Sequence, residues 1–157
     1  MKKLLIANRG EIALRIMRSA KSKGLETVAV YTDADADAPH RHFADEAVRI
    51  GEGPAGESYL SIERLLEVAL QTGADAVHPG YGFLSERAEF CRAVTAAGLS
   101  FVGPSADAID AMGNKAAAKR LMIAAGVPCI PGYEGAAQDD PSLITAGQDI
   151  GFPLMVK

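Results

Sequence analysis

Short apolar runs alternate with amphipathic stretches along most of this chain. The amphipathic stretches repeat apolar residues at helical spacing and predict helices over residues 11–23, 41–44, 61–71 and 86–97. The apolar runs between them predict five strands, at residues 3–7, 27–31, 47–50, 74–77 and 100–102. Strands that alternate with helices pack as a parallel sheet covered on both faces. We therefore predict an α/β fold with an open parallel sheet of about five strands.

The pattern changes after residue 102. Two helices are expected at 106–112 and 115–125, and a connector rich in proline and glycine follows. Asp140 could cap a further helix, with Pro141 in its first turn. Residues 154–157 are expected to begin a strand, which needs partner strands for its hydrogen bonds. We therefore expect a piece of a longer protein, divided into a domain at 1–112, a connecting helix at 113–128 and an incomplete domain at 129–157.

Composition narrows the function classes. The 48% hydrophobic content is enough for a sizeable core, and a net charge of −4 argues against a dominant nucleic-acid or membrane-surface role. Cys91 and Cys129 are far apart, which suits a reducing cytoplasm better than a disulfide scaffold. Only four apolar residues follow the N-terminal lysines, too few for the apolar core of a signal peptide. No run has transmembrane length.

A glycine-rich, partly polar bend, His78 to Glu86, follows the fourth predicted strand. Open α/β sheets bind their ligands at the carboxyl ends of their strands. Gly80 and Gly82 carry no side chain, so a ligand could approach the backbone closely at both positions. An ordinary strand-to-helix turn, with Ser85 as the helix N-cap, explains the same residues equally well.

Three other positions could hold an anion. Gly10 lies in the first strand-to-helix turn, where amide N–H groups can bind phosphate, but only one of the three glycines of a dinucleotide fingerprint is present. Lys115 begins a helix, where the helix dipole favours an anion, and Lys157 ends an apolar run. Each lysine fits either a phosphate ligand or a solvated side chain, and a tight turn is the simpler interpretation of Gly10.

Metal ligands are not indicated. His40 and His42 are too few for a structural zinc site. Asp33, Asp35 and Asp37 alternate without the glycine and terminal glutamate of a calcium loop, so they predict a solvated turn. The sequence therefore predicts no metal site.

Seven short motifs follow one another along the chain. They are IANRGEIA at 6–13, ADEA at 44–47, SYL at 58–60, HPGYGFLSE at 78–86, FVGP at 101–104, MGNK at 112–115 and AGVP at 125–128. In this order they resemble the N-terminal part of biotin carboxylase, including the biotin-carrying subunits of acyl-CoA carboxylases. The match covers essentially the whole chain and is far more specific than any single motif.

The resemblance implies an ATP-grasp ligase that uses ATP and Mg²⁺ to activate bicarbonate as carboxyphosphate and then carboxylates carrier-bound biotin. It also implies that the sheet domain is Rossmann-like and that a truncated start of an ATP-grasp domain follows. Six positions match functional positions of the family: Lys115 and Lys157 (ATP), Tyr81, Gly82 and Glu86 (border of the biotin and bicarbonate site) and Arg18 (dimer interface).

The resemblance also implies bicarbonate, a biotin carrier domain, a carboxyltransferase subunit and a second copy of the protein as partners. The family's lid, metal-binding carboxylates, general base and biotin-steadying arginine lie beyond Lys157, so we expect this chain alone to be inactive and to bind ATP weakly. Lys115 and the bend at 80–82 are expected to share one cleft. Two alternatives stay open: another ATP-grasp ligase of the carbamoyl phosphate synthetase type, and a non-catalytic scaffold or dimerisation module.

Overall fold

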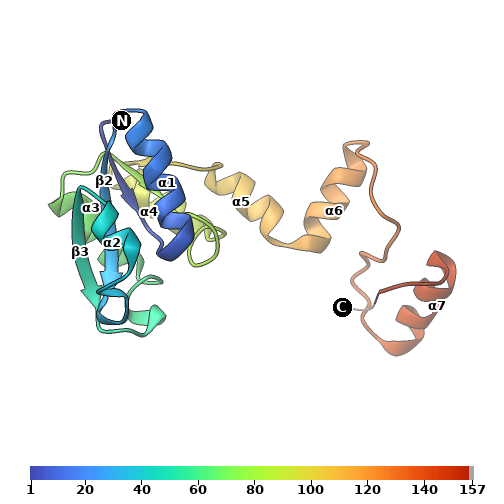
Figure 1. Ribbon diagram of the computed structural model, residues 1–157. Helices are drawn as coiled ribbons and strands as arrows, with labels where there is room; N and C mark the ends of the chain where they lie inside the picture. The colour runs from blue at the N-terminus through green and yellow to red at the C-terminus, as the bar shows by residue number, and fades with distance from the viewer. Residues whose placement is uncertain (156–157) are drawn as a thin grey trace. The chain divides into compact units, whose positions relative to one another are not determined.

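The computed structural model describes residues 1–155, and the chain divides into two compact units (Figure 1). The first unit spans Met1–Asp110 and the second begins at Ala111. All strands of the sheet belong to the first unit. No helix within residues 1–155 is both long and apolar enough to cross a membrane.

Five parallel strands form the sheet of the first unit, in the order β3-β2-β1-β4-β5. The strands are β1 (Lys3–Ile6), β2 (Glu26–Thr32), β3 (Glu46–Gly51), β4 (Ala76–His78) and β5 (Ser100–Phe101). This confirms the predicted open parallel sheet. The chain winds outward from β1 to β3 and then returns to place β4 on the other side of β1. The winding therefore reverses direction between β1 and β4.

Four α-helices accompany the sheet, close to their predicted positions. They are α1 (Gly10–Ser22), α2 (Pro39–Phe43), α3 (Ile62–Gln71) and α4 (Ala88–Ala96). Short 3₁₀ turns occur at Asp33–Asp35 and Ala55–Glu57. Leu65, Val68 and Ala69 form the buried side of α3, whereas Leu70 is 58% exposed.

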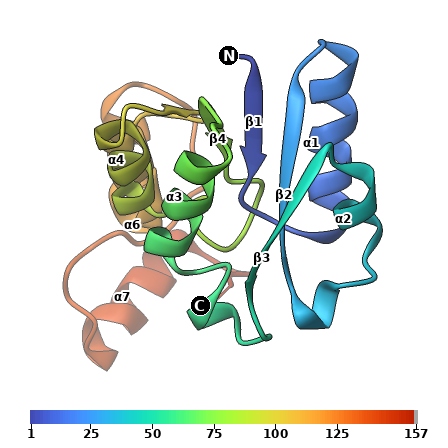
Figure 2. The same ribbon diagram turned by 90° about the vertical axis from the view of Figure 1, so that its left-hand side faces the viewer.

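Helices cover both faces of the sheet, as predicted. Figure 2 shows α1 and α2 on one face and α3 and α4 on the other. Side chains alternate between faces along a strand, so Leu5 packs in one buried cluster while Leu4 and Ile6 pack in a second. The first cluster includes Leu65 of α3 and Phe90 of α4, and the second includes the buried side of α1. This double burial explains why the strands are apolar at successive positions.

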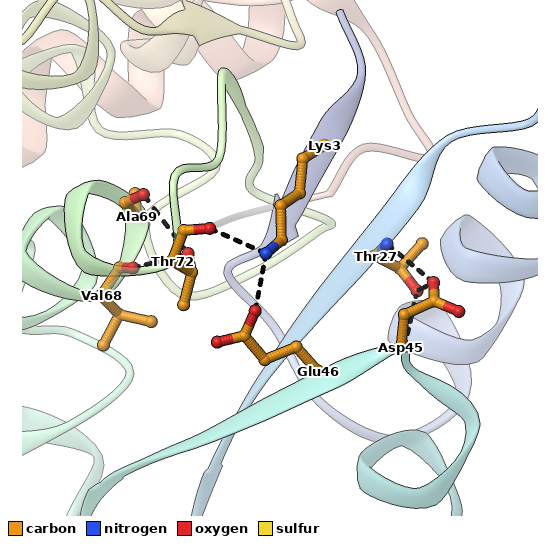
Figure 3. A network of polar contacts seen from close by, with 7 residues as sticks. All are labelled: Lys3, Thr27, Asp45, Glu46, Val68, Ala69 and Thr72. Atoms are coloured by element: carbon orange, nitrogen blue, oxygen red, sulfur yellow. Dashed lines mark hydrogen bonds and ion pairs between the residues drawn. The ribbon is translucent and has the colours of Figure 1, made fainter.

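Polar side chains tie the elements together at the amino ends of the strands (Figure 3). The Nζ of Lys3 donates to Glu46 Oε2 at 2.6 Å and to the carbonyl of Thr72, just after α3, at 2.7 Å. Asp45 accepts hydrogen bonds from the Thr27 amide at 2.9 Å and from the Thr27 hydroxyl at 2.7 Å. A cation near the last carbonyls of a helix is electrostatically favourable. This edge of the sheet therefore has a structural role.

The second unit is helical in its described part. Helix α5 (Ala106–Gly113) crosses the boundary between the units, and α6 (Lys115–Ala124) and α7 (Asp140–Ile150) follow. The N-cap of α7 is Asp139, whose carboxylate accepts from Ser142 N, so the prediction of Asp140 as the cap was wrong by one residue. Leu154 and Met155 are not in a strand. Val156 and Lys157, the rest of that predicted strand, lie outside the described residues.

Candidate functional site

Two turns meet at the centre of the carboxyl edge of the sheet. One joins β1 to α1. The other joins β4 to α4 and consists of residues 79–87, because His78 belongs to β4; these residues are called the bend from here on. Strands β1 and β4 are hydrogen-bonded neighbours, although they lie about 70 positions apart in the sequence. Ligands of open α/β sheets bind where the winding reverses, which is at these two turns.

Asn8 connects the two turns. Its Nδ2 donates to the carbonyl of Pro79 at 2.9 Å and to that of Tyr81 at 2.8 Å. Its Oδ1 accepts from the amide of Arg9 at 2.9 Å. The side chain is 3% exposed, so both of its amide donors are used inside the protein. Asn8 therefore ties the turn after β1 to the bend after β4.

The two glycines of the bend have different surroundings. A β-carbon at Gly80 would lie 2.7 Å from Asn8 Nδ2, and the residue has a φ of +69°. Only glycine fits at position 80, because any side chain would collide with Asn8. We expected the missing side chain of Gly80 to make room for a ligand, but it makes room for Asn8. A β-carbon at Gly82 would meet no atom within 4 Å. Gly82 therefore presents its backbone to open space.

The bend is closed by turn hydrogen bonds before α4 begins. Ser85 N donates to Gly82 O at 2.9 Å, and Arg87 N donates to Leu84 O at 3.1 Å. Because of this extra turn, α4 starts at Ala88 with Arg87 in the N-cap position, and the prediction of Ser85 as the cap was wrong. Phe83 has a φ of +44°, which is unusual for an aromatic residue and is held by its surroundings.

Arg9 lies beside two stacked aromatic rings, that of Tyr59 and that of Phe83 in the bend. Tyr59 and Phe83 are stacked with their centroids 5.2 Å apart, and the Arg9 guanidinium lies 5.3 Å from the Tyr59 centroid and 5.7 Å from that of Phe83. Nη1 of Arg9 also donates to Asp35 at 3.0 Å. A cation beside aromatic rings is attracted by their quadrupoles. The stack therefore holds Phe83 in its strained conformation.

Asp35 joins these groups from the loop after β2. It accepts from the Tyr59 hydroxyl at 2.7 Å and from Thr32 Oγ1 at 3.0 Å, besides Arg9. Burial alone would raise the pKa of Asp35, but the hydrogen bonds from Tyr59, Arg9 and Thr32 together lower it. The prediction of a solvated turn was therefore wrong for Asp35, whereas Asp33, paired with Arg49 at 2.6 Å, is exposed as predicted.

Two histidines lie near this edge, and burial lowers the pKa of both. His78 Nδ1 accepts from the amide of Gly80 at 3.0 Å, so the neutral ring also supports the bend. His40 is fully buried, with Nε2 3.2 Å from the carbonyl of Val30, which makes Nε2 its protonated nitrogen. Its Nδ1 has no hydrogen-bond partner among the described residues. Across residues 1–155, no three His, Cys, Asp or Glu side chains are grouped so that they could hold a metal ion.

The predicted site residues divide between the two units. Tyr81, Gly82 and Glu86 all lie on the bend and are exposed, Tyr81 by 64%. Lys115 belongs to the second unit, at the first position of α6, where Asn114 Oδ1 caps the helix by accepting from Ala117 N. Lys157 lies outside the described residues.

Arg18, the predicted interface residue, is on the exposed side of α1. Its guanidinium lies 6.0 Å from the centroid of the Phe43 ring in α2.

Sequence reasoning missed Asn8, Arg9, Asp35 and Tyr59. Asn8 and Arg9 were visible as polar residues directly after a buried strand. Their partners, however, come from other strand ends and depend on the order of the strands in the sheet. Predicting these contacts would therefore have required the order of the strands in the sheet.

Comparisons with known proteins agree on one family. The family model for the biotin carboxylase N-terminal domain matches residues 1–109. The α subunit of mitochondrial methylcrotonoyl-CoA carboxylase from Oryza sativa subsp. japonica is 55% identical over 157 residues, which are 100% of this chain and 21% of that protein. Biotin carboxylase from Halalkalibacterium halodurans is 51% identical over 156 residues, 99% of this chain and 34% of that protein.

A solved structure is similar in fold as well as in sequence. The biotin carboxylase domain dimer of Hydrogenobacter thermophilus 2-oxoglutarate carboxylase, in complex with MgADP, ADP and bicarbonate, matches with a TM-score of 0.89 and 45% identity. The match covers 97% of this chain and 33% of that one. This chain therefore spans about a third or less of the length of these relatives.

Proposed function

This chain belongs to the family of biotin carboxylase N-terminal domains, and we propose from this that the protein containing it is an ATP-dependent biotin carboxylase. In this proposal the whole protein activates bicarbonate with ATP and transfers the carboxyl group to biotin on a carrier domain. The reaction is the first half of a biotin-dependent carboxylation, such as that of an acyl-CoA carboxylase. The sheet domain supplies one wall of the site.

The observation that carries the proposal is the outward face of the bend. Tyr81, Gly82 and Glu86 are exposed there, on a backbone that Asn8 anchors from within. The backbone of Gly82 adjoins open space, so a small planar anion such as bicarbonate could approach it. The Tyr81 hydroxyl can donate a hydrogen bond to such an anion or to the ureido oxygen of biotin. We therefore assign these three residues to the border of the bicarbonate and biotin site.

We assign Lys115 to ATP. It occupies the first position of α6, where the helix dipole favours negative charge, and its side chain is exposed. An ammonium group there suits the phosphate oxygens of a nucleotide. Lys157 completes the assignment by sequence similarity alone.

Mg²⁺ does not fit the described part of the chain. No suitable ligand group occurs within residues 1–155, so we assign its ligands to a later part of the parent protein. The described residues bind and orient substrate in this proposal. Without lid and metal we expect the chain alone to be inactive, because phosphoryl transfer depends on positioning and charge neutralisation.

Partners follow from the same assignment. A biotin carrier domain and a carboxyltransferase subunit would supply biotin and use its carboxyl group, and Arg18 is a candidate contact between two copies of the protein. Two free thiols far apart in the sequence, Cys91 and Cys129, suit the cytoplasmic location that we predicted.

The test uses the whole protein that contains this chain. ATP cleavage should depend on bicarbonate, should be accelerated by free biotin, and should yield labelled carboxybiotin from labelled bicarbonate. ATP cleavage that ignores bicarbonate, or that needs ammonia instead, would overturn the proposal in favour of another ligase. Calorimetry of the 157-residue chain with ATP should give no micromolar affinity, and tight binding would contradict the expected division of the site.

A further inference from the structure

The turn between β1 and α1 directs two successive side chains at the bend. In many open α/β sheets this first turn binds a phosphate through its backbone. Here Asn8 and Arg9 instead contact residues 79–83 of the same domain. The turn after β1 therefore stabilises the conformation of the bend after β4.

Asn8 fixes the backbone of the bend at two points. Its Nδ2 lies within 2.9 Å of the carbonyl oxygens of Pro79 and Tyr81, on either side of Gly80. Losing these bonds would leave the buried carbonyl of Pro79 and the partly buried carbonyl of Tyr81 without their hydrogen-bond donor. Both carbonyls consequently point inward, and the peptide that links Tyr81 to Gly82 is oriented by Asn8.

Arg9 supports Phe83, the residue that follows Gly82 in the bend. Its guanidinium lies beside the ring of Phe83, which is stacked on Tyr59 and has a positive φ. Asp35 accepts a hydrogen bond from the same guanidinium at 3.0 Å. The inner side of the bend is thus held from residue 79 to residue 83, while Tyr81 and Gly82 stay exposed on its outer side.

We propose that Asn8 is a positioning residue for substrate recognition: by holding the carbonyls of Pro79 and Tyr81 it sets the orientation of Tyr81 and Gly82 toward a planar carboxylate-like substrate. This role rests on the proposed function, because that function places the outer face of the bend at the border of the bicarbonate and biotin site. Asn8 touches no substrate in this role and acts through the bend. Binding free energy that depends on orientation is lost when a supporting contact loosens.

The test is Asn8→Asp in the whole protein. The substitution keeps the size of the side chain and the acceptor for Arg9 N, but it replaces the donating NH₂ by an oxygen that repels the two carbonyls. Asn8→Asp loses the hydrogen bonds to the carbonyls of Pro79 and Tyr81, and we expect the KM for bicarbonate to rise by about tenfold as a result. The KM for ATP should stay within about twofold, since Lys115 is untouched. Amide hydrogen exchange in peptide 79–86 should rise by about the same tenfold factor.

Thr27→Val is the matched control. Thr27 is buried and hydrogen-bonded to Asp45 at the opposite edge of the sheet, so its loss should destabilise the domain without touching the bend. A merely structural Asn8 would behave in the same way as this control: lower thermal stability, faster exchange throughout the sheet and unchanged KM for bicarbonate. That result would overturn the inference.

The outcomes also separate the inference from the function on which it rests. An unmodified protein that cleaves ATP without regard to bicarbonate would overturn the proposed function and the substrate assigned to the bend. An active protein in which Asn8→Asp changes neither exchange at 79–86 nor the KM for bicarbonate would overturn the role of Asn8 alone. Faster exchange confined to the bend, together with a selective rise in the KM for bicarbonate, supports both.

Discussion

A β-carbon at residue 80 would stand 2.7 Å from the Nδ2 of Asn8, closer than a carbon and a nitrogen can pack. Gly80 and Asn8 are therefore a matched pair, although they lie 72 positions apart in the sequence. The amide needs its room because it donates to the carbonyls that flank the glycine.

Gly80→Ala should destabilise the first unit by about 2 kcal/mol or more, because the added methyl group displaces a buried amide and the left-handed φ is strained. In an Asn8→Gly background, which also removes the Asn8 Cβ that would lie 2.9 Å away, the clash disappears, and the cost of Gly80→Ala should fall to the strain alone, about 1 kcal/mol. Urea denaturation of the four proteins measures this coupling. Strictly additive costs would show that the two residues do not constrain each other.

Tyr59→Phe should cost about 1–2 kcal/mol, because it removes the hydroxyl that donates to Asp35 at 2.7 Å but leaves the ring stack in place. Thermal denaturation measures the loss, and Tyr59→Leu, which removes the stack as well, should cost more. Equal stability of Tyr59→Phe and the unmodified chain would mean that Asp35 is satisfied by Arg9 and Thr32 alone.

Stability should fall as the pH drops below about 6.5. Burial lowers the pKa of His40 and His78 in the folded state from the ordinary value of 6.5. Below that pH the unfolded chain therefore binds more protons than the folded one. Each histidine contributes a slope of at most about 1.4 kcal/mol per pH unit. His40→Gln keeps an N–H donor for Val30 and should flatten the curve between pH 6.5 and 5, in urea titrations at constant ionic strength. An unchanged slope would show that His40 takes up its proton while folded.

Lys3→Met should lower stability by about 1 kcal/mol, because Glu46 and the Thr72 carbonyl lose their shared donor. Bicarbonate-dependent ATP cleavage by the whole protein should be unchanged, since Lys3 lies at the amino edge of the sheet and the bend at the carboxyl edge. A raised KM for bicarbonate in this variant would contradict the assignment of separate roles to the two edges.

Lys115→Met should raise the KM for ATP in the whole protein by about tenfold or more, as expected for the loss of one charge-assisted phosphate contact. Thermal stability should change little, because the side chain is exposed at the start of α6. Lys119→Met is the comparison, since Lys119 is paired with Glu134 in the same helical unit and has no assigned role in ATP binding. If the two variants raised the KM for ATP equally, Lys115 would contribute only positive charge, and its assignment to a specific phosphate contact would be wrong.

The strands and helices could be predicted because their apolar residues are buried on one or both faces. The first residue of α4 could not be predicted, because turn hydrogen bonds from the amides of Ser85 and Arg87 delay the start of the helix to Ala88. Ser85 is a common N-cap residue, so it looked like the cap in the sequence. The same limit applies at α7, where Asp139 and Asp140 are equally good caps and backbone geometry decides between them.

The exposed half of the candidate site was accessible from the sequence, and the buried half was not. Tyr81, Gly82 and Glu86 belong to one continuous motif, so a resemblance could locate them together. Asn8 and Asp35 are single polar residues whose partners lie at other strand ends, and Asp35 looked like one of three equivalent aspartates. The strands are parallel, so their carboxyl ends lie on the same side of the sheet, but only the order β3-β2-β1-β4-β5 makes the ends of β2, β1 and β4 neighbours.

The Asn8 amide, held between the turns that follow β1 and β4, also has a pharmacological consequence. A compound built to mimic NAD and to bind at this turn through its diphosphate would meet a side-chain amide already hydrogen-bonded to two carbonyl groups. Chemical libraries directed at dehydrogenases should therefore yield few cross-reacting compounds for this domain, despite the shared strand order.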